Sequence, residues 1–181
     1  MSFPKRYADQ VAKLRVPSGF LLVAAFLWLA SPSNLSLALG LPLALAGLAL
    51  RAWAAGHLEK NMQLTTSGPF AYIRNPLYVG TLTVAAGFVL AARRWELALL
   101  FGAVFLLVYL PVVELEEQHL HTLFPDFAAY VARVPKLIPS RGARALPSSK
   151  RFRFSQYLHN CEYEAGLGFL AGAAVLLWKA L

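Results

Sequence analysis

The sequence is poor in cysteine, in acidic residues and in charge of any kind. Its single cysteine, Cys161, has no partner for an internal disulfide and none for a thiolate metal site. Two of the four histidines, His119 and His121, lie two positions apart, which points them to opposite sides of a helix. Only 14% of the 181 residues are charged. We therefore predict no metal centre and find no support for redox or zinc-thiolate chemistry.

Apolar sequence takes the place of the missing charge. Hydrophobic residues make up 58% of the chain, and the mean hydropathy is +0.54. A helix that crosses a bilayer needs about 17 to 25 residues. Five apolar segments approach or reach that length: 19–30, 35–55, 77–92, 97–113 and 165–177. The second and fourth are the clearest, and the chain is expected to be an all-α, multi-pass integral membrane protein with about five transmembrane helices.

The lysines and arginines predict an orientation. They precede the first apolar segment, lie between the second and third, and gather at 133–153, so we expect these parts and the amino terminus to be cytoplasmic. Arg93, Arg94 and Lys179 then face the other side. Attraction to anionic lipids accounts for the net charge of +8, so a nucleic-acid partner is not expected. The first apolar segment could also be a secretory signal, but we favour a retained anchor.

No internal repeat divides the chain, and we predict a single membrane domain over residues 1–181. Within it we distinguish a motif core at 51–139, a basic linker at 140–155 that lies against lipid headgroups, and a C-terminal helix at 160–181. Glu162 and Glu164 stand just before the last apolar segment. They either reach a neighbouring site or mark the membrane boundary.

The polar stretch 64–80 separates the second and third apolar segments and contains two proline turns. Pro76 suits the first turn of a helix, with Asn75 as its cap, and the amides at that helix start could hold an anionic ligand end. The alternative is an ordinary interfacial loop in which Arg74 touches lipid phosphate and the aromatic residues form a belt.

Three carboxylates, Glu114, Glu116 and Glu117, follow the fourth apolar segment. On a continuing helix Glu114 and Glu117 share a face, Glu116 points elsewhere, and His121 lies four residues after Glu117 and could pair with it. Carboxylates at a membrane boundary are costly unless they are solvated or matched. These residues therefore mark a solvated helix exit, or one or two of them face a polar cavity and bind ribose hydroxyls, an ammonium group or a substrate proton.

An ordered set of these residues resembles a known family. The set is Gly68-Pro69-Phe70, Tyr72, Arg74-Asn75-Pro76-Leu77-Tyr78-Val79-Gly80, then Glu116-Glu117, Leu120, Phe124, Tyr130, Val134-Pro135 and Pro139. It is similar to the isoprenylcysteine carboxyl methyltransferase and phospholipid methyltransferase group of integral membrane enzymes. That group has a Gly-Pro-Tyr turn, an Arg-His-Pro-x-Tyr-x-Gly segment, a transmembrane hairpin, Glu-Glu-x-x-Leu, an aromatic-Gly pair, a Tyr and a closing Pro.

The resemblance implies an S-adenosylmethionine-dependent methyltransferase with its cofactor site at the cytoplasmic face. The acceptor is then a lipophilic molecule from the bilayer, either a phospholipid amine headgroup or an isoprenylcysteine-type carboxylate. The residues carried over as catalytic are Arg74, Tyr78, Glu116 and Glu117. Those carried over as cofactor-binding are Gly68, Tyr72, Asn75, Pro76, Tyr78, Gly80, Glu116, Glu117 and Leu120.

Three positions depart from the pattern of the group: Asn75 replaces its His, Phe70 a Tyr, and Pro125 a Gly. An amide can donate and accept hydrogen bonds, but any role that needs an imidazole is lost. These departures leave the acceptor more open than the cofactor. Methyl transfer from a sulfonium needs in-line positioning in a polar cavity more than it needs acid catalysis, because the leaving thioether is neutral.

Two alternatives remain open. Membrane reductases of steroids and isoprenoids resemble the group in their carboxy-terminal helices and carry a similar loop, but they bind a reduced nicotinamide dinucleotide phosphate. The chain has only one or two arginines near the loop for the second phosphate of that cofactor. The other alternative is a noncatalytic lipid-binding membrane protein. The sequence determines neither the acceptor nor the oligomeric state.

Overall fold

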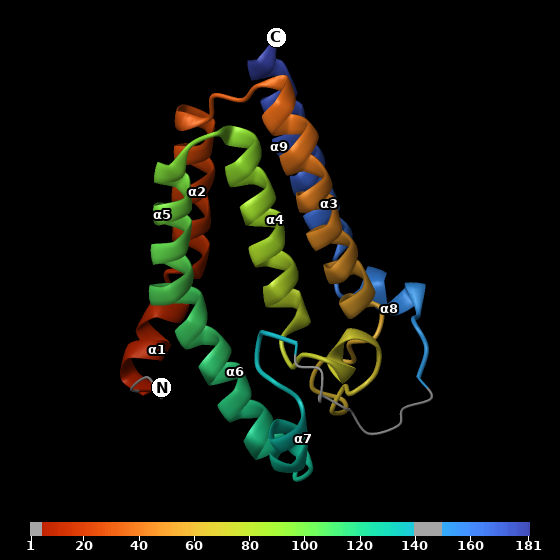
Figure 1. Ribbon diagram of the computed structural model, residues 1–181. Coiled ribbons are helices and arrows are strands. Elements are labelled where there is room, and N and C mark those ends of the chain that lie inside the picture. Colours follow the sequence, from red (N-terminus) through yellow and green to blue (C-terminus); the bar gives the residue numbers. More distant parts are fainter. Residues whose placement is uncertain (1–4, 140–149) are drawn as a thin grey trace.

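A computed structural model describes residues 5–139 and 150–181, and within those ranges the chain forms helices and loops without a strand (Figure 1). The helices are α1 (Lys5–Ala12), α2 (Arg15–Leu29), α3 (Asn34–Ala55), the 3-10 turn η1 (Gly68–Ala71), α4 (Pro76–Ala92), α5 (Trp95–Val104), the π-turn η2 (Phe105–Tyr109), α6 (Leu110–Leu123), α7 (Phe127–Arg133), α8 (Phe154–His159) and α9 (Tyr163–Ala180). The predicted all-α class is thereby confirmed for the described residues. Most of the expected basic linker, 140–149, lies outside them.

Long apolar helices form the body of the molecule. In Figure 1, α2 and α5 lie on one side, α3 and α9 lie on the other, and α4 runs between them. Two helices, Asn34–Ala55 and the continuous run Trp95–Leu123, are long and apolar enough to cross a membrane, and two shorter apolar helices, Arg15–Leu29 and Pro76–Ala92, accompany them. The two long helices contain the two segments that were clearest in the sequence. Trp28 of α2 is 86% exposed, as expected for a side chain that faces lipid.

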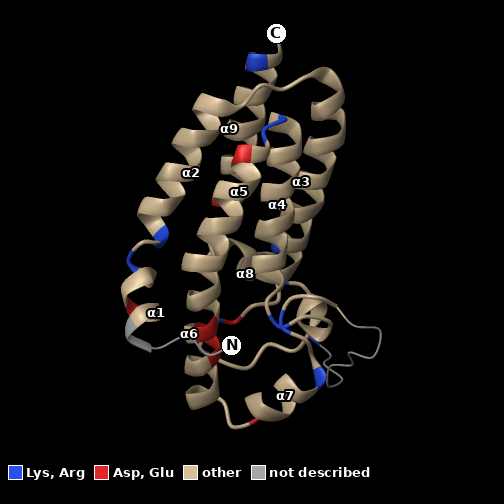
Figure 2. Cartoon of the chain, turned by 60° about the vertical axis from the view of Figure 1, so that its left-hand side comes forward, with Lys and Arg blue, Asp and Glu red and all other residues tan. Residues whose placement is uncertain are grey.

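Charged side chains gather at one end of these helices. Figure 2 shows most of the acidic and basic residues near α1, α6 and α7, whereas the helical shafts are almost free of them. At the opposite end, Arg94 Nε donates to the Leu29 carbonyl at 2.9 Å and Lys179 Nζ donates to the Ala30 carbonyl at 3.0 Å. These basic side chains satisfy carbonyls at the end of α2 that have no partner within the helix.

Small residues form the extensive contact between α3 and α4. A Cβ atom at Gly40 would lie 2.5 Å from the Gly87 carbonyl oxygen and 2.6 Å from the Ala91 nitrogen. A Cβ atom at Gly47 would lie 2.7 Å from the Gly80 carbonyl oxygen. Only glycine allows the two backbones to come this close, as in other membrane helix pairs built on small residues. We refer to Gly40, Gly47, Gly80 and Gly87 as the glycine seam.

The π-turn in the long helix provides a docking point for α1. Pro111 has no N–H to donate to the Leu107 carbonyl four residues before it. The hydroxyl of Tyr7 in α1 donates to that carbonyl at 2.9 Å instead. This contact seats α1 against the long helix, and the guanidinium of Arg15, which follows α1, lies 5.8 Å from the centre of the Tyr109 ring. The π-turn thus brings the N-terminal region to the charged end of the molecule.

Candidate functional site

A cavity of about 550 Å³ lies at the charged end of the molecule. The loop after α3, the start of α4, and helices α6 and α7 supply most of its walls. Its volume falls within the range of roughly 300 to 1,000 Å³ that small-molecule sites occupy. Polar, charged and aromatic side chains line it together, so the cavity can hold a ligand that has both polar and flat apolar parts.

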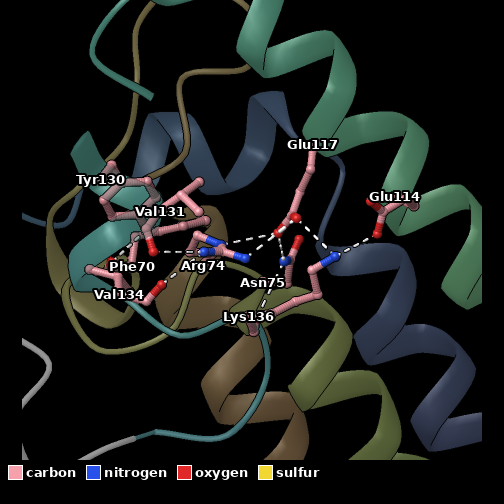
Figure 3. Close-up of polar contacts among 9 residues, drawn as sticks. All are labelled: Phe70, Arg74, Asn75, Glu114, Glu117, Tyr130, Val131, Val134 and Lys136. Carbon is pink, nitrogen blue, oxygen red and sulfur yellow. Dashed lines mark hydrogen bonds and ion pairs between the residues drawn. The ribbon is translucent and has the colours of Figure 1, made fainter. Parts of the chain in front are cut away.

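Arg74 joins three elements at the cavity wall (Figure 3). Its Nε lies 3.1 Å from Oε1 of Glu117 and its Nη2 lies 3.4 Å from Oε2, a two-pronged contact between the loop and α6. Its Nη1 donates to the carbonyls of Val131 and Val134 at 3.0 and 3.1 Å. Both charged side chains are only about one tenth exposed. A bidentate pair with this much burial fixes geometry as well as charge.

Asn75 adds a second connection to Glu117. It occupies the N-cap position of α4 and Pro76 begins the helix, as predicted, but its side chain makes no capping bond. The Asn75 Nδ2 donates to Oε1 of Glu117 at 3.0 Å instead. The backbone N–H groups of Arg74 and Asn75 donate to the carbonyls of Pro135 and Lys136 at 2.9 and 3.2 Å. These two amides, next to the helix start where we expected an anionic ligand, therefore already have partners.

Lys136 completes the surroundings of Glu117. Its Nζ lies 2.7 Å from Oε2 of Glu114 and 2.9 Å from Oε2 of Glu117, which confirms that these two carboxylates share a helix face. Burial acts to lower the pKa of Lys136, but hydrogen bonds and the charges of both glutamates outweigh it and leave the pKa raised. The Glu117 carboxylate thus receives donors from Arg74, Asn75 and Lys136.

Glu116 has a different environment. Its side chain is 47% exposed, and the one ion pair that it forms with a described residue is a loose contact of 3.9 Å with Nη1 of Arg15. Next to Glu116, the Tyr78 side chain is 8% exposed. The Tyr78 hydroxyl interacts electrostatically with Glu116 but makes no hydrogen bond of normal geometry with any described residue. Buried polar atoms are almost always hydrogen-bonded. A hydroxyl that lines a cavity without such a bond is therefore a place where a ligand would be expected to bind.

The structure brings most of the predicted site residues together. Those that line the cavity are Arg74, Asn75, Pro76, Tyr78, Glu116, Glu117 and Leu120. Three others do not line it. Gly68 has a φ of +58° and packs against the His57 ring, Tyr72 is 55% exposed, and Gly80 lies under the side chain of Arg51 in the glycine seam.

Several cavity residues were not singled out from the sequence, among them Arg15, Arg51, Thr81 and Tyr109. Arg51 carried a usable signal, because an arginine within an apolar helix usually has a functional partner. Arg15 carried none, since it reaches the cavity only through the fold.

The predicted contact between His121 and Glu117 is not formed. His121 packs edge-on against the Phe127 ring, with 4.6 Å between the ring centres. Glu117 turns instead toward Arg74 and Lys136, which compensate its charge more strongly than a histidine would. Within residues 5–139 and 150–181 no group of three or more His, Cys, Asp or Glu side chains could hold a metal ion.

Tyr130 secures the cavity wall between α7 and η1. Its hydroxyl donates to the Phe70 carbonyl at 2.7 Å in a buried contact. We expect Tyr130→Phe to lower the free energy of unfolding by about 1 to 2 kcal/mol, because the buried carbonyl loses its donor. The midpoint of thermal unfolding in detergent, compared with that of the wild type, measures the loss. An unchanged midpoint would contradict the role assigned to this bond.

The same residue gives a pH prediction. Burial raises the pKa of Tyr130 above its ordinary value of about 10, and the pKa of Lys136 is also raised above about 10.5. A raised pKa contributes stability that is fully present below the unfolded-state pKa and is lost as the pH rises toward the folded-state pKa. The temperature midpoint of unfolding should therefore decrease as the pH rises above about 10. The decrease should be less steep in the double variant Tyr130→Phe/Lys136→Met. Equal slopes in the two proteins would contradict the prediction.

Comparison with known proteins places this arrangement in a family. Over 112 residues the chain is 36% identical to the cobalt-zinc-cadmium resistance protein CzcN of Cupriavidus metallidurans, covering 60% of this chain and 50% of that protein. It is 32% identical over 103 residues to the nickel-cobalt-cadmium resistance protein NccN of Alcaligenes xylosoxydans xylosoxydans, covering 56% of this chain and 47% of that protein. The chain thus spans about half the length of the curated relatives it matches.

No solved structure matches the chain. The profile of the phospholipid methyltransferase family matches residues 15–126, which include α2 to α6 and most of the cavity wall, from Arg15 through Arg74 to Glu117. The match extends over more than half of the chain, and the chain belongs to the phospholipid methyltransferase family.

Proposed function

We propose that the protein transfers a methyl group from S-adenosylmethionine to a lipophilic acceptor taken from the membrane. The observation that carries the proposal is the buried hydroxyl of Tyr78, which makes no hydrogen bond of normal geometry with a described residue, in a cavity that it shares with Glu116. Membership of a methyltransferase family supports the reaction type. The position of the cavity at the charged end of apolar helices supports an acceptor whose tail stays in lipid while its reactive group reaches the polar end.

The cavity fits the chemical groups of this cofactor. The ribose hydroxyls and the amino group need acceptors, which the half-exposed Glu116 carboxylate provides. The adenine ring needs flat apolar surface, which Phe70, Tyr109 and Phe127 provide among the lining residues. When bound, the cofactor supplies an electrophilic methyl group and leaves as a neutral thioether. The protein therefore has to hold and orient two molecules and to balance positive charge.

We assign different roles to the two adjacent glutamates. Glu117 positions the site, because Arg74, Asn75 and Lys136 already use its acceptor capacity. Glu116 contacts the ligand, because its ion pair with Arg15 is long and its half-exposed side chain lines the cavity. In this assignment Glu116 balances a cationic group or accepts a proton from an amine acceptor, and the Tyr78 hydroxyl hydrogen-bonds the bound molecule.

The arrangement in the membrane belongs to the same proposal. About five spans, formed around α2, α3, α4, the long helix through α5 and α6, and α9, would leave the cavity on the cytoplasmic side. Among the described basic residues, Arg15, Lys60 and Arg74 support that orientation, since all three line the cavity at the charged end.

The reductase alternative is less well supported by the charges of the cavity. A nicotinamide dinucleotide phosphate brings several phosphates, which need cations that are free to bind them. Each of the three arginines that line the cavity faces a glutamate, in the pairs Arg15–Glu116, Arg51–Glu162 and Arg74–Glu117. Lys60 also lines the cavity and forms no ion pair with a described residue, so the cavity offers one free cation where this cofactor brings several phosphates. The paired arginines therefore favour a cofactor of lower net charge.

Calorimetric titration of the detergent-solubilised protein tests the proposal, with S-adenosylhomocysteine and with reduced nicotinamide dinucleotide phosphate as separate probes. We expect saturable binding of the first probe only. We expect Tyr78→Phe and Glu116→Gln each to weaken it about tenfold, which corresponds to the loss of one hydrogen bond to a charged or buried group. Glu114→Gln is the matched control, because Glu114 lies on the same helix but does not line the cavity. Binding of the nicotinamide probe alone would overturn the proposal.

A further inference from the structure

Arg51 and Glu162 form a partly buried ion pair beside the cavity. Nε of Arg51 lies 2.6 Å from Oε1 of Glu162, and Nη2 lies 3.0 Å from Oε2. Nη1 of Arg51 donates to the Thr81 hydroxyl at 2.5 Å and to the Leu77 carbonyl at 3.5 Å. The Glu162 side chain is 6% exposed. Arg51 lines the cavity, so this pair is part of its wall.

The glycine seam determines where Arg51 lies. A Cβ atom at Gly80 would come 2.5 Å from Cγ of Arg51 and 2.8 Å from the Gly47 carbonyl oxygen. Without a side chain at residue 80, the stem of Arg51 passes over α4 and its guanidinium reaches Thr81. The seam is therefore needed to deliver this cation to the cavity.

The C-terminal segment determines where Glu162 lies. Asn160 Nδ2 donates to the carbonyls of Ala55 and Leu58 at 2.9 Å each, and the Arg153 N–H donates to the Gly56 carbonyl at 2.9 Å. These bonds satisfy carbonyls at the C-terminal end of α3. They tie the start of α9 to the same helix that carries Arg51, so the register between Arg51 and Glu162 is fixed.

The pair joins a part of the chain that the family profile matches to a part that it does not match. Arg51 lies within the stretch that the family profile matches, residues 15–126, whereas Glu162 lies beyond it. Four of the five N–H groups of Arg51 are already engaged, so Arg51 is a poor binding site for an anionic ligand. What the pair controls is the charge of the cavity. Without Glu162 a partly buried arginine would be left without a compensating charge in the cavity wall.

We infer that Glu162 is a positioning residue of the transferase site, which neutralises Arg51 and thereby makes the cavity suitable for a cationic ligand. The inference rests on the proposed function, in which the ligand is the sulfonium cofactor. The C-terminal extension thereby becomes part of the site and favours a positively charged ligand.

The ratio of two dissociation constants tests the inference. S-adenosylmethionine carries one more positive charge than S-adenosylhomocysteine, and the two are otherwise nearly the same size. Calorimetry on the full chain gives both constants for the wild type and for Glu162→Gln. We expect Glu162→Gln to weaken the binding of S-adenosylmethionine about tenfold more than the binding of S-adenosylhomocysteine. An unscreened charge in a partly buried site produces an effect of this size.

A second variant shifts the ratio the other way. Arg51→Gln leaves Glu162 as an unmatched negative charge, so the affinity for S-adenosylmethionine should rise relative to the affinity for S-adenosylhomocysteine. The double variant Arg51→Gln/Glu162→Gln should return the ratio of the two dissociation constants to the wild-type value. These shifts remain measurable if one variant folds poorly. Glu164→Gln is the matched control, because Glu164 is exposed two residues further along.

The outcomes separate the two levels of the argument. The role of Glu162 would be overturned if Glu162→Gln weakened the binding of both probes equally, or if Arg51→Gln did not shift the ratio of dissociation constants in the opposite direction. Either result would leave the proposed function standing. A folded wild-type protein that binds neither probe would overturn the proposed function, and the inference would fall with it.

Discussion

Replacing Glu117 with alanine should remove about 3 to 5 kcal/mol from the free energy of unfolding, the usual cost of leaving buried charges without their partner. The substitution leaves Arg74, whose side chain is 10% exposed, without its carboxylate partner. It removes one of the two carboxylates that contact Lys136. It also removes the nearer of the two acceptors of the Asn75 side chain, which keeps only its long bond to the Lys136 carbonyl. Thermal unfolding in detergent should show a midpoint lower by roughly 10 °C.

Glu116→Ala is the matched control for that substitution. Glu116 is the adjacent residue on the same helix and carries the same charge, but it is half exposed and its contact with Arg15 is long. An exposed ion pair of this kind contributes about 0 to 1 kcal/mol. The two substitutions should therefore differ in their effects on stability and on ligand binding. Glu117→Ala loses stability, whereas Glu116→Ala keeps stability and loses affinity for S-adenosylhomocysteine. If both cost the same stability, the division of roles between the glutamates is wrong.

Sequence reasoning succeeded where a single helix decides the outcome. The shared face of Glu114 and Glu117 follows from 3.6 residues per turn, and the structure confirms it through Lys136, which contacts both. The start of α4 at Pro76 follows from the fixed φ of proline and its missing N–H. These predictions need no knowledge of what lies opposite.

Sequence reasoning failed where a side chain chooses among distant partners. Asn75 is a good capping residue, yet its side chain is turned so that Nδ2 donates to Glu117, 42 residues away, and Oδ1 accepts from no helix amide. A hydrogen bond to a charged carboxylate is stronger than a neutral cap bond. His121 has the right spacing for Glu117, yet Lys136 and Arg74 take that carboxylate. Periodicity states which face a residue occupies but not which cation the fold brings to it.

Gly80 illustrates a related limit. The family resemblance nominated it as a cofactor-binding residue, and its cofactor role stays a prediction. The structure gives it a packing role that the sequence pattern could not reveal, since the pattern does not show that Gly47 and Arg51 lie against it. A glycine in a motif next to a site can serve the ligand directly or can serve a neighbouring helix that carries a site residue.

A single methyl group in the glycine seam should be enough to disturb the site. In Gly40→Ala the new Cβ would lie 2.5 Å from the Gly87 carbonyl oxygen and 2.6 Å from the Ala91 nitrogen, both backbone atoms that cannot rotate away. We expect a loss of about 1 to 3 kcal/mol in the free energy of unfolding, the usual cost of overpacking, although alanine is the better helix former.

Gly102→Ala separates the packing effect from helix propensity. A Cβ atom at Gly102 of α5 would meet nothing within 4 Å, so this substitution should leave stability unchanged or raise it by up to about 1 kcal/mol. The seam also sets the distance between α3, which carries Arg51, and α4, which carries Tyr78. Gly40→Ala should therefore weaken S-adenosylhomocysteine binding although residue 40 does not line the cavity. If Gly40→Ala and Gly102→Ala behave alike in unfolding and in binding, the close approach of α3 and α4 is not what shapes the site.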